Sequence, residues 1–255
     1  MPRFANDGHS LHYEVHGEGR PVVLLHGITV SFAGNYAAWG WIDALVARGF
    51  RVIGLDFRGH GGSDKPRDPA AYGTDALAGD VLALLDHLGI AHASLIGYSL
   101  GSKIALHLLR AAPGRWGPTV LIATGDGLIG LPPFTSAEVL PRIADAVSRA
   151  EFPADLPSHQ AAYWTFATEV GGDRHAAVAA ARASYPPCSP DALAGIDVPV
   201  LVVSGERDPV LGQGPRLAQA LPRGRYLEIA NTDHFELAGR KAARAAAVAF
   251  LEESA

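Results

Sequence analysis

The chain has 255 residues, 48% of them hydrophobic, which is enough for one α/β domain with a large core. It carries 21 Lys and Arg against 26 Asp and Glu, a net charge of −5 without a run of like charge, which argues against a nucleic-acid partner. The N-terminal segment lacks an apolar stretch of signal-peptide length, no segment approaches the roughly 18 apolar residues of a membrane span, and the single cysteine, Cys188, excludes an internal disulfide. We therefore expect a cytoplasmic protein with no nucleic-acid or membrane partner, and the sequence leaves its oligomeric state open.

The apolar pattern alternates between strands and helices along most of the chain. It begins with a predicted hairpin, because "RFAND" and "SLHYEVHG" flank Asp7-Gly8-His9 and Asp-Gly favours a tight turn. Continuous apolar runs then predict buried strands at 20–27, 51–61, 92–99, 117–124, 198–205 and 224–231, and helical spacing predicts helices at 35–50, 74–90, 100–113, 212–222 and 239–253. This alternation predicts an α/β fold, with a mostly parallel twisted sheet flanked by helices.

Residues 125–194 interrupt the alternation. This interval has no buried-strand run, is rich in Pro and Ala, and contains helix-like pieces at 136–150 and 158–170. It leaves the carboxyl end of a strand, where open α/β sheets bind their ligands. We expect a core made of 1–124 and 195–255 and a helical cap or lid at 125–194. Four aromatic side chains are candidates for the substrate pocket: Tyr98 next to the sheet, and Phe134, Trp164 and Phe166 in the cap.

The stretch Gly97-Tyr98-Ser99-Leu100-Gly101 fits the pattern G-x-S-x-G, the nucleophile elbow. A predicted strand precedes it and a predicted helix follows it. Such a turn holds the serine hydroxyl clear of the sheet, and the flanking glycines let the strand and helix backbones approach each other. The sequence therefore predicts Ser99 as a catalytic nucleophile.

A nucleophilic serine needs a base, and the base needs an acid that orients it. Asp208 and His234 follow Ser99 in the order acid, then histidine, and each comes after a predicted strand. Asp126, after an earlier strand, is the rival acid. Asp233 is interpreted as a loop residue, because adjacent side chains rarely orient each other as a triad requires.

Backbone N–H groups are the expected stabilisers of an oxyanion. The amide of Leu100 follows the nucleophile, and the amide of Ile28 lies in the loop after the first buried parallel strand. His26, in the same loop, is interpreted as structural. The stretch "DFRGHGGSD" is interpreted as a tightly folded loop with a local polar network of Asp56, Arg58 and His60.

The motifs "LLHG", "DFRGHGGSD", "GYSLGS", "GERD" and "NTDHF" together resemble those of the α/β-hydrolase superfamily, and the resemblance covers nearly the whole chain. It implies a triad of Ser99, Asp208 and His234, oxyanion donors at Ile28 and Leu100, the cap described above, and no cofactor. Serine at the elbow departs from the aspartate of haloalkane dehalogenases and epoxide hydrolases. Ser102 stands where many relatives have a third glycine, and its hydroxyl either packs or hydrogen-bonds under the elbow.

The leading hypothesis is a serine hydrolase of the carboxylic-ester hydrolase class, acting on a small-to-medium ester or lactone through an acyl-enzyme. The family members that the sequence resembles leave three alternatives open: a cofactor-free perhydrolase, an enzyme like 3-oxoadipate enol-lactonase, and a receptor-like member with slow turnover. We expect no metal, because the eleven histidines lack metal-ligand spacing.

Overall fold

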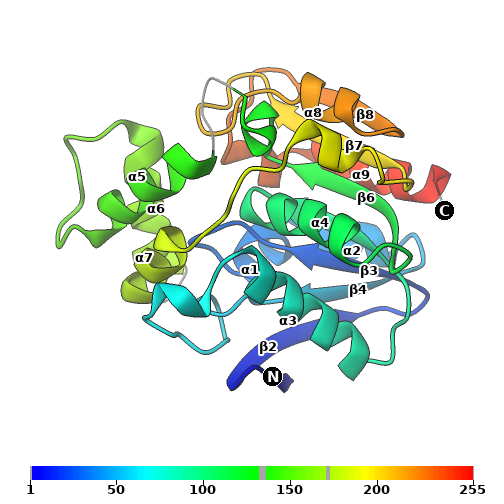
Figure 1. Ribbon diagram of the computed structural model, residues 1–255, viewed down its shortest axis with the longest axis horizontal. Coiled ribbons are helices and arrows are strands. Elements are labelled where there is room, and N and C mark those ends of the chain that lie inside the picture. The colour runs from blue at the N-terminus through cyan, green and yellow to red at the C-terminus, as the bar shows by residue number, and fades with distance from the viewer. Residues whose placement is uncertain (1, 132–135, 171–172, 255) are drawn as a thin grey trace.

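The structure, a computed structural model, describes residues 2–131, 136–170 and 173–254. Its centre is an eight-stranded sheet with the order β1-β2-β4-β3-β5-β6-β7-β8 (Figure 1). The strands β1 and β2 are antiparallel and lie at one edge, and all the others run parallel. The strands are Arg3–Asn6 (β1), His9–His16 (β2), Arg20–Leu25 (β3), Phe50–Leu55 (β4), Ala93–Tyr98 (β5), Trp116–Ile122 (β6), Val200–Gly205 (β7) and Gly224–Ile229 (β8). The predicted fold class is confirmed.

Helices cover both faces of this sheet. One apolar core contains side chains of α3, α4 and α8, and a second core contains side chains of α2 and α9. The helices of the core are Phe32–Asn35 (α1), Trp41–Val46 (α2), Thr74–His87 (α3), Leu100–Ala111 (α4), Pro215–Ala220 (α8) and Lys241–Glu253 (α9). Short 3₁₀ turns lie at Ala37–Trp39 (η1), Pro69–Ala71 (η2), Asp126–Ile129 (η3), Pro190–Leu193 (η5) and Glu236–Gly239 (η6).

The first hairpin forms where the sequence predicts it. Asp7 and Gly8 have φ angles of 50° and 75°, which is the left-handed pair of a two-residue type I′ turn. Asn6 therefore pairs with His9 at the start of the antiparallel ladder. This hairpin closes the sheet on the side away from β8.

The predicted helix at 35–50 is wrong in its extent. Gly40 has a φ of 71° and separates η1 from α2, so the apolar spacing on its two sides does not belong to one helix. Trp39, the last residue of η1, is 48% exposed. The helix predicted at 74–90 begins at Thr74, and its N-cap is Gly73, so no side chain caps it.

Between β6 and β7 the chain leaves the sheet and forms a cluster of helices, seen at the left of Figure 1. It contains Ser136–Ser148 (α5), Ser158–Thr165 (α6), a π-helical turn at Phe166–Val170 (η4) and Arg174–Arg182 (α7). We call this cluster the cap helices. The domain boundaries at 125 and 194 stay a prediction, and Phe134 lies outside the described residues.

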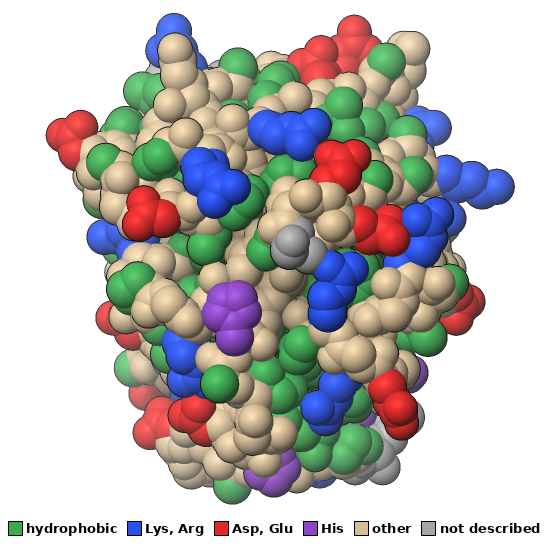
Figure 2. Space-filling view, turned by 90° about the vertical axis from the view of Figure 1, so that its right-hand side faces the viewer, with side chains coloured by type: hydrophobic (Ala, Val, Ile, Leu, Met, Phe, Trp, Pro, Cys, Tyr) green, Lys and Arg blue, Asp and Glu red, His purple; other side chains and the backbone are tan. Residues whose placement is uncertain are grey.

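Charged side chains do not gather by sign on the side of the molecule opposite the cap helices. Basic and acidic groups are interspersed with apolar ones on that face (Figure 2). Within the described ranges, no helix is both long and apolar enough to cross a membrane.

Candidate active site

Ser99 sits in a strained turn between β5 and α4. Its φ is 52° and its ψ is −110°, a conformation that costs about 1–3 kcal/mol outside glycine. Two glycines allow the tight approach around it. A Cβ at Gly97 would lie 2.5 Å from the carbonyl oxygen of Gly101, and a Cβ at Gly101 would lie 1.9 Å from that of Leu25. The turn has the backbone geometry that the sequence predicts for a nucleophile elbow.

The hydroxyl of Ser102 hydrogen-bonds under this turn. It lies 2.8 Å from the carbonyl oxygens of both Gly97 and Ile122, and it accepts the Ile122 amide at 3.0 Å. The Ser99 amide also donates to the Ile122 carbonyl at 2.8 Å. Ser102 therefore ties β5, β6 and α4 together at the elbow, which resolves the choice that the sequence left open.

Three side chains form a hydrogen-bonded chain at the carboxyl ends of β5, β7 and β8. The Ser99 hydroxyl lies 3.0 Å from His234 Nε2, and His234 Nδ1 lies 2.8 Å from Asp208 Oδ2. The other carboxylate oxygen, Oδ1, accepts the amides of Val210 and Leu211 at 2.7 and 3.0 Å. The structure thus brings together the three residues predicted as a triad, although they are far apart in sequence.

The Asp208 carboxylate determines which ring nitrogen of His234 carries the proton. Burial of Asp208 raises its pKa, but the neighbouring His234 and the two backbone amides outweigh burial, so its pKa lies below the ordinary value. An ionised carboxylate is only an acceptor, so the proton of the neutral imidazole lies on Nδ1. His234 Nε2 is then free to accept the proton of Ser99.

The rival acidic residues have other partners. Asp126 Oδ1 accepts the Leu217 amide at 2.8 Å, in the first turn of α8, so this carboxylate caps a helix. Asp233 Oδ1 accepts the amides of Phe235 and Glu236, both at 2.9 Å. The Asp126 carboxylate thus caps α8, and the Asp233 carboxylate holds the loop in which the sequence places it.

The loop after β3 presents the Ile28 amide between two anchored neighbours. The amide of Gly27 donates to Asn35 Oδ1 at 2.9 Å, and the amide of Thr29 donates to His60 Nε2 at 3.2 Å. Leu100 is the first residue of α4, so its N–H has no acceptor within that helix. We propose that these two amides, of Ile28 and Leu100, form the oxyanion hole that the sequence predicts.

His26 and His60 are structural parts of this loop. His26 Nδ1 donates to the Gly27 carbonyl at 2.7 Å, and its Nε2 accepts the Phe57 amide at 3.0 Å. His60 Nδ1 likewise donates to the Arg58 carbonyl at 3.0 Å. Burial lowers the pKa of both imidazoles, that of His60 to about 3, so both remain neutral acceptors near pH 7.

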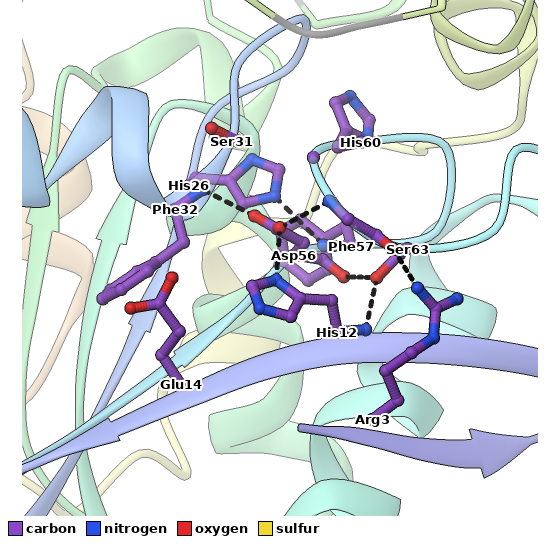
Figure 3. A network of polar contacts seen from close by, with 12 residues as sticks. Arg3, His12, Glu14, His26, Ser31, Phe32, Asp56, Phe57, His60 and Ser63 are labelled. Carbon is purple, nitrogen blue, oxygen red and sulfur yellow. Dashed lines mark hydrogen bonds and ion pairs between the residues drawn. The ribbon is translucent and has the colours of Figure 1, made fainter. Parts of the chain in front are cut away.

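Asp56 lies at the centre of the polar network beneath the loop (Figure 3). Its carboxylate accepts the Phe32 amide, the Gly62 amide and His12 Nδ1, each at 2.8 Å. Burial raises its pKa, but His26 and these hydrogen bonds together hold the pKa below its ordinary value. The carboxylate is therefore ionised and joins the start of α1 to the turn after β4.

Arg58, in the same loop, binds a different carboxylate. Its guanidinium makes two hydrogen bonds, at 2.7 and 2.6 Å, to the fully buried carboxylate of Asp80 on α3. It also donates to the Ala71 carbonyl at 2.9 Å. This bidentate pair fixes the loop against α3. The three residues predicted as one network thus make largely separate contacts: His60 bonds to the Arg58 carbonyl, but the Arg58 guanidinium pairs with Asp80 rather than with Asp56.

Two cavities adjoin Ser99. The large cavity, of about 300 Å³, is mainly apolar and is lined by Gly27, Ile28, Val30, Gly34, Asn35, Ala38, Trp39, Tyr98, Ser99, Tyr163, Phe166, His234, Phe235 and Ala238. The small cavity, of about 30 Å³, is lined by Ile28, Ser99, Leu100, Lys103, Leu128, Val139, Leu140, Ile143, Tyr163, Val210 and Leu211. Both therefore lie between the sheet and the cap helices, where the sequence places a pocket.

The four aromatic pocket candidates have different outcomes. Tyr98 and Phe166 line the large cavity. Trp164 lines neither cavity, because its indole donates to the Arg149 carbonyl at 3.0 Å and its ring packs edge-on against Phe152. Phe134, outside the described residues, has no structural outcome.

Two aromatic residues of the large cavity's lining were not predicted from the sequence. Phe235 packs against His234, Tyr163 and Phe166, and Trp39 lines the same cavity from η1. A signal for Phe235 was present, since it directly follows the predicted base. Nothing in the spacing around Trp39 distinguished a cavity position from a core position.

Two comparisons identify the family. Residues 20–156 match the family of the alpha/beta hydrolase fold. A non-heme chloroperoxidase from Streptomyces lividans is 32% identical over 253 aligned residues, covering 85% of this chain and 86% of that protein. The chain therefore belongs to the alpha/beta hydrolase fold family.

Solved structures agree over nearly the full length. A hydrolase from Pseudomonas aeruginosa PA01 superposes with a TM-score of 0.79 at 27% identity, covering 98% of this chain and 97% of that chain. An enol-lactonase from Burkholderia xenovorans LB400 superposes with a TM-score of 0.78 at 30% identity, covering 98% and 100%. The chain spans less than half the length of several other curated relatives that it matches.

Proposed function

We propose that the protein is a serine hydrolase that cleaves a small-to-medium carboxylic ester or lactone through an acyl-enzyme. The observation that carries the proposal is the chain of hydrogen bonds from Ser99 through His234 to Asp208. Ser99, at the start of this chain, lines an apolar cavity. A nucleophile, a base within 3.0 Å of it and an acid that orients the base are the parts that acyl transfer needs.

Acylation begins when Ser99 Oγ attacks the carbonyl carbon and His234 Nε2 takes the hydroxyl proton. The oxygen that becomes negative is stabilised by the amides of Ile28 and Leu100. The imidazolium is stabilised by the Asp208 carboxylate. When the tetrahedral intermediate collapses, the C–O bond of the ester breaks and His234 returns the proton to the leaving alkoxide. The acyl group remains on Ser99.

Deacylation repeats these steps with water. His234 Nε2 takes a proton from a water molecule as that water attacks the acyl carbon. The proton then passes to Ser99 Oγ as the acyl bond to the serine breaks, and the carboxylic acid leaves. In both halves of the cycle, His234 Nε2 takes up the proton and gives it back.

The apolar lining of the large cavity supports an ester or lactone in preference to a charged substrate. Similarity to the enol-lactonase from Burkholderia xenovorans supports the lactone as one form of this substrate. In a lactone, acyl and alcohol groups are joined, so the same attack opens the ring.

A second candidate, perhydrolysis, is favoured by the similarity to the non-heme chloroperoxidase. Hydrogen peroxide would attack the acyl-enzyme in place of water. The products are then a peracid and free Ser99, and His234 moves the same proton. This reaction uses the same residues and differs only in the attacking molecule.

One screen tests these alternatives. Turnover is measured with p-nitrophenyl esters, γ- and δ-lactones and thioesters, with and without hydrogen peroxide, and peracid is detected with a chromogenic electron donor. Rapid ester or lactone turnover in water supports the hydrolase. Peracid release faster than acid release selects the second candidate. Turnover so slow that the acyl-enzyme persists for hours would instead fit the receptor-like alternative and would contradict the proposed hydrolase.

A further inference from the structure

The two cavities that meet at Ser99 differ about tenfold in volume. The large cavity has about 300 Å³ and the small one about 30 Å³. Ser99, Ile28 and Tyr163 line both of them, so both open on the position of the reacting carbonyl. Of these two cavities, only the large one is lined by His234. Because only one cavity adjoins His234, the acyl half and the alcohol half of an ester can each be assigned to one cavity.

The leaving group must lie beside the base. His234 Nε2 donates a proton to the alkoxide oxygen as it leaves, so that oxygen has to come within hydrogen-bond distance of the imidazole. Only the large cavity brings a substrate group next to His234. The alcohol half of the ester therefore occupies the large cavity, and the acyl half, on the other side of the reacting carbon, points into the small cavity.

Buried aliphatic side chains make up most of the wall of the small cavity, which Lys103 also lines. Leu128 is 1% exposed and Ile143 is 3% exposed. Val210 and Leu211 form another wall, and their amides are held by the Asp208 carboxylate. A wall anchored to the triad cannot move aside without moving the acid. The small cavity offers far less room than the large one, which limits the acyl chain to a short one.

On the basis of the hydrolase function proposed above, we propose that the preferred substrates combine a short acyl group, such as acetyl, with a larger apolar alcohol. The large cavity fits such an alcohol, since Trp39, Phe166 and Phe235 give it aromatic walls. A longer acyl chain would have to displace packed side chains around Leu128 and Leu140. This overpacking lowers the rate, because each extra methylene adds strain in a narrow pocket.

The walls of the small cavity also separate it from larger spaces. Leu128 lines a neighbouring cavity of about 270 Å³, and Leu140 lines another of about 360 Å³. Shortening either side chain should join the small cavity to the space behind it. The two leucines are therefore the proposed determinants of acyl length.

The first experiment measures kcat/KM for two series of esters. One series varies the acyl group of a p-nitrophenyl ester from acetate through butanoate to octanoate. The other keeps acetate and varies the alcohol from ethanol to hexanol and 2-phenylethanol. We expect kcat/KM to fall by about tenfold or more from acetate to butanoate, and to rise from ethyl to the larger alcohols. Equal or higher rates with octanoate would overturn the proposal.

The second experiment uses matched variants. Leu128→Ala and Leu140→Ala should each raise the ratio of butanoate to acetate turnover about tenfold, because they open the acyl side. Phe166→Ala should lower the preference for large alcohols and leave the acyl ratio unchanged. Trp164→Ala is the control, since Trp164 is also an aromatic cap residue but lines neither cavity. It should change neither ratio.

Labelling with a fluorophosphonate probe distinguishes a failure of the proposed hydrolase function from a failure of the proposed acyl site. Every variant that is labelled at wild-type stoichiometry retains a folded, reactive site. An unlabelled wild-type protein without ester turnover would refute the hydrolase itself. A labelled protein whose leucine variants keep the wild-type acyl ratio would refute only the assignment of the small cavity to the acyl group.

Discussion

The Tyr98 hydroxyl donates a hydrogen bond to the backbone carbonyl of His234. The residue before Ser99 thereby holds the backbone of His234. Burial and the charge of Asp208 raise the pKa of this phenol well above its ordinary value, so the hydroxyl stays protonated and keeps its role as donor. Ser99 and His234 are thus linked twice, through their side chains and through Tyr98.

Removing this link should affect catalysis more than folding. Tyr98→Phe loses one hydrogen bond to the loop that carries His234, and we expect kcat/KM to fall by about tenfold through a lower kcat. Tyr36→Phe is the matched control, because Tyr36 is also fully buried and donates to the Leu25 carbonyl at 2.9 Å. Steady-state kinetics and thermal unfolding of both variants test the expectation. Equal kinetic losses in the two variants would show that Tyr98 acts only through stability.

The acid of the triad is tested by a pair of aspartates. Asp208→Asn replaces the carboxylate that accepts from His234 Nδ1 with an amide that can favour the wrong tautomer, and we expect kcat to fall by about 10³–10⁴. Asp126→Asn keeps an oxygen that can accept the Leu217 amide, so activity should stay near that of the wild type. The measurement is kcat for a p-nitrophenyl ester, with circular dichroism as the folding check. A larger loss in Asp126→Asn would reverse the assignment.

Stability should depend on pH through His60. Its pKa is lowered by burial from 6.5 to about 3, so the unfolded chain binds a proton below pH 6.5 that the folded protein does not bind. The free energy of unfolding should therefore fall as the pH drops from 6.5 towards 3, by at most about 1.4 kcal/mol per pH unit for this residue. Asp56 and Asp208 have lowered pKa values and contribute in the same direction, but only below about pH 4, where carboxyl groups of the unfolded chain take up protons.

A glutamine in place of His60 isolates that contribution. The amide oxygen in His60→Gln can still accept the Thr29 amide, but it does not titrate in this range. Urea unfolding of both proteins between about pH 4.5 and 7 should show a steeper loss for the wild type on the acid side. Parallel curves for wild type and variant would mean that His60 takes up a proton without cost in the folded protein.

The sequence was sufficient to predict the chain of contacts at the site. The glycines around Ser99 indicated the elbow because no larger residue fits at Gly97 or Gly101, as the close carbonyl approaches show. Asp126 and Asp208 both lie between Ser99 and His234, so chain order alone did not separate them, and the resemblance of the motif "GERD" favoured Asp208. The elbow was predictable because its backbone constraint is local and leaves a clear mark in sequence.

The lining of the cavities was less predictable, because it depends on how the cap helices are rotated against the core. Trp164 and Phe166 are two residues apart, and only Phe166 faces the large cavity. Trp164 belongs to α6, whereas Phe166 begins the π-helical turn that follows. The spacing of apolar residues does not reveal where the α-helix changes into the π-helical turn. The position of Trp39 was hidden for a similar reason, since Gly40 ends η1 and separates Trp39 from α2 within the single helix that the sequence predicted.

The central claim is that Ser99 carries the acyl group. The most direct measurement is intact-protein and peptide mass spectrometry after rapid acid quenching of the reaction with p-nitrophenyl acetate. We expect one acetyl group in the wild-type protein, on the peptide that contains Ser99. We expect none in Ser99→Ala, whose kcat should be lower by about 10⁴. An acetyl group on another residue that turns over at the catalytic rate, or wild-type turnover in Ser99→Ala, would contradict the account.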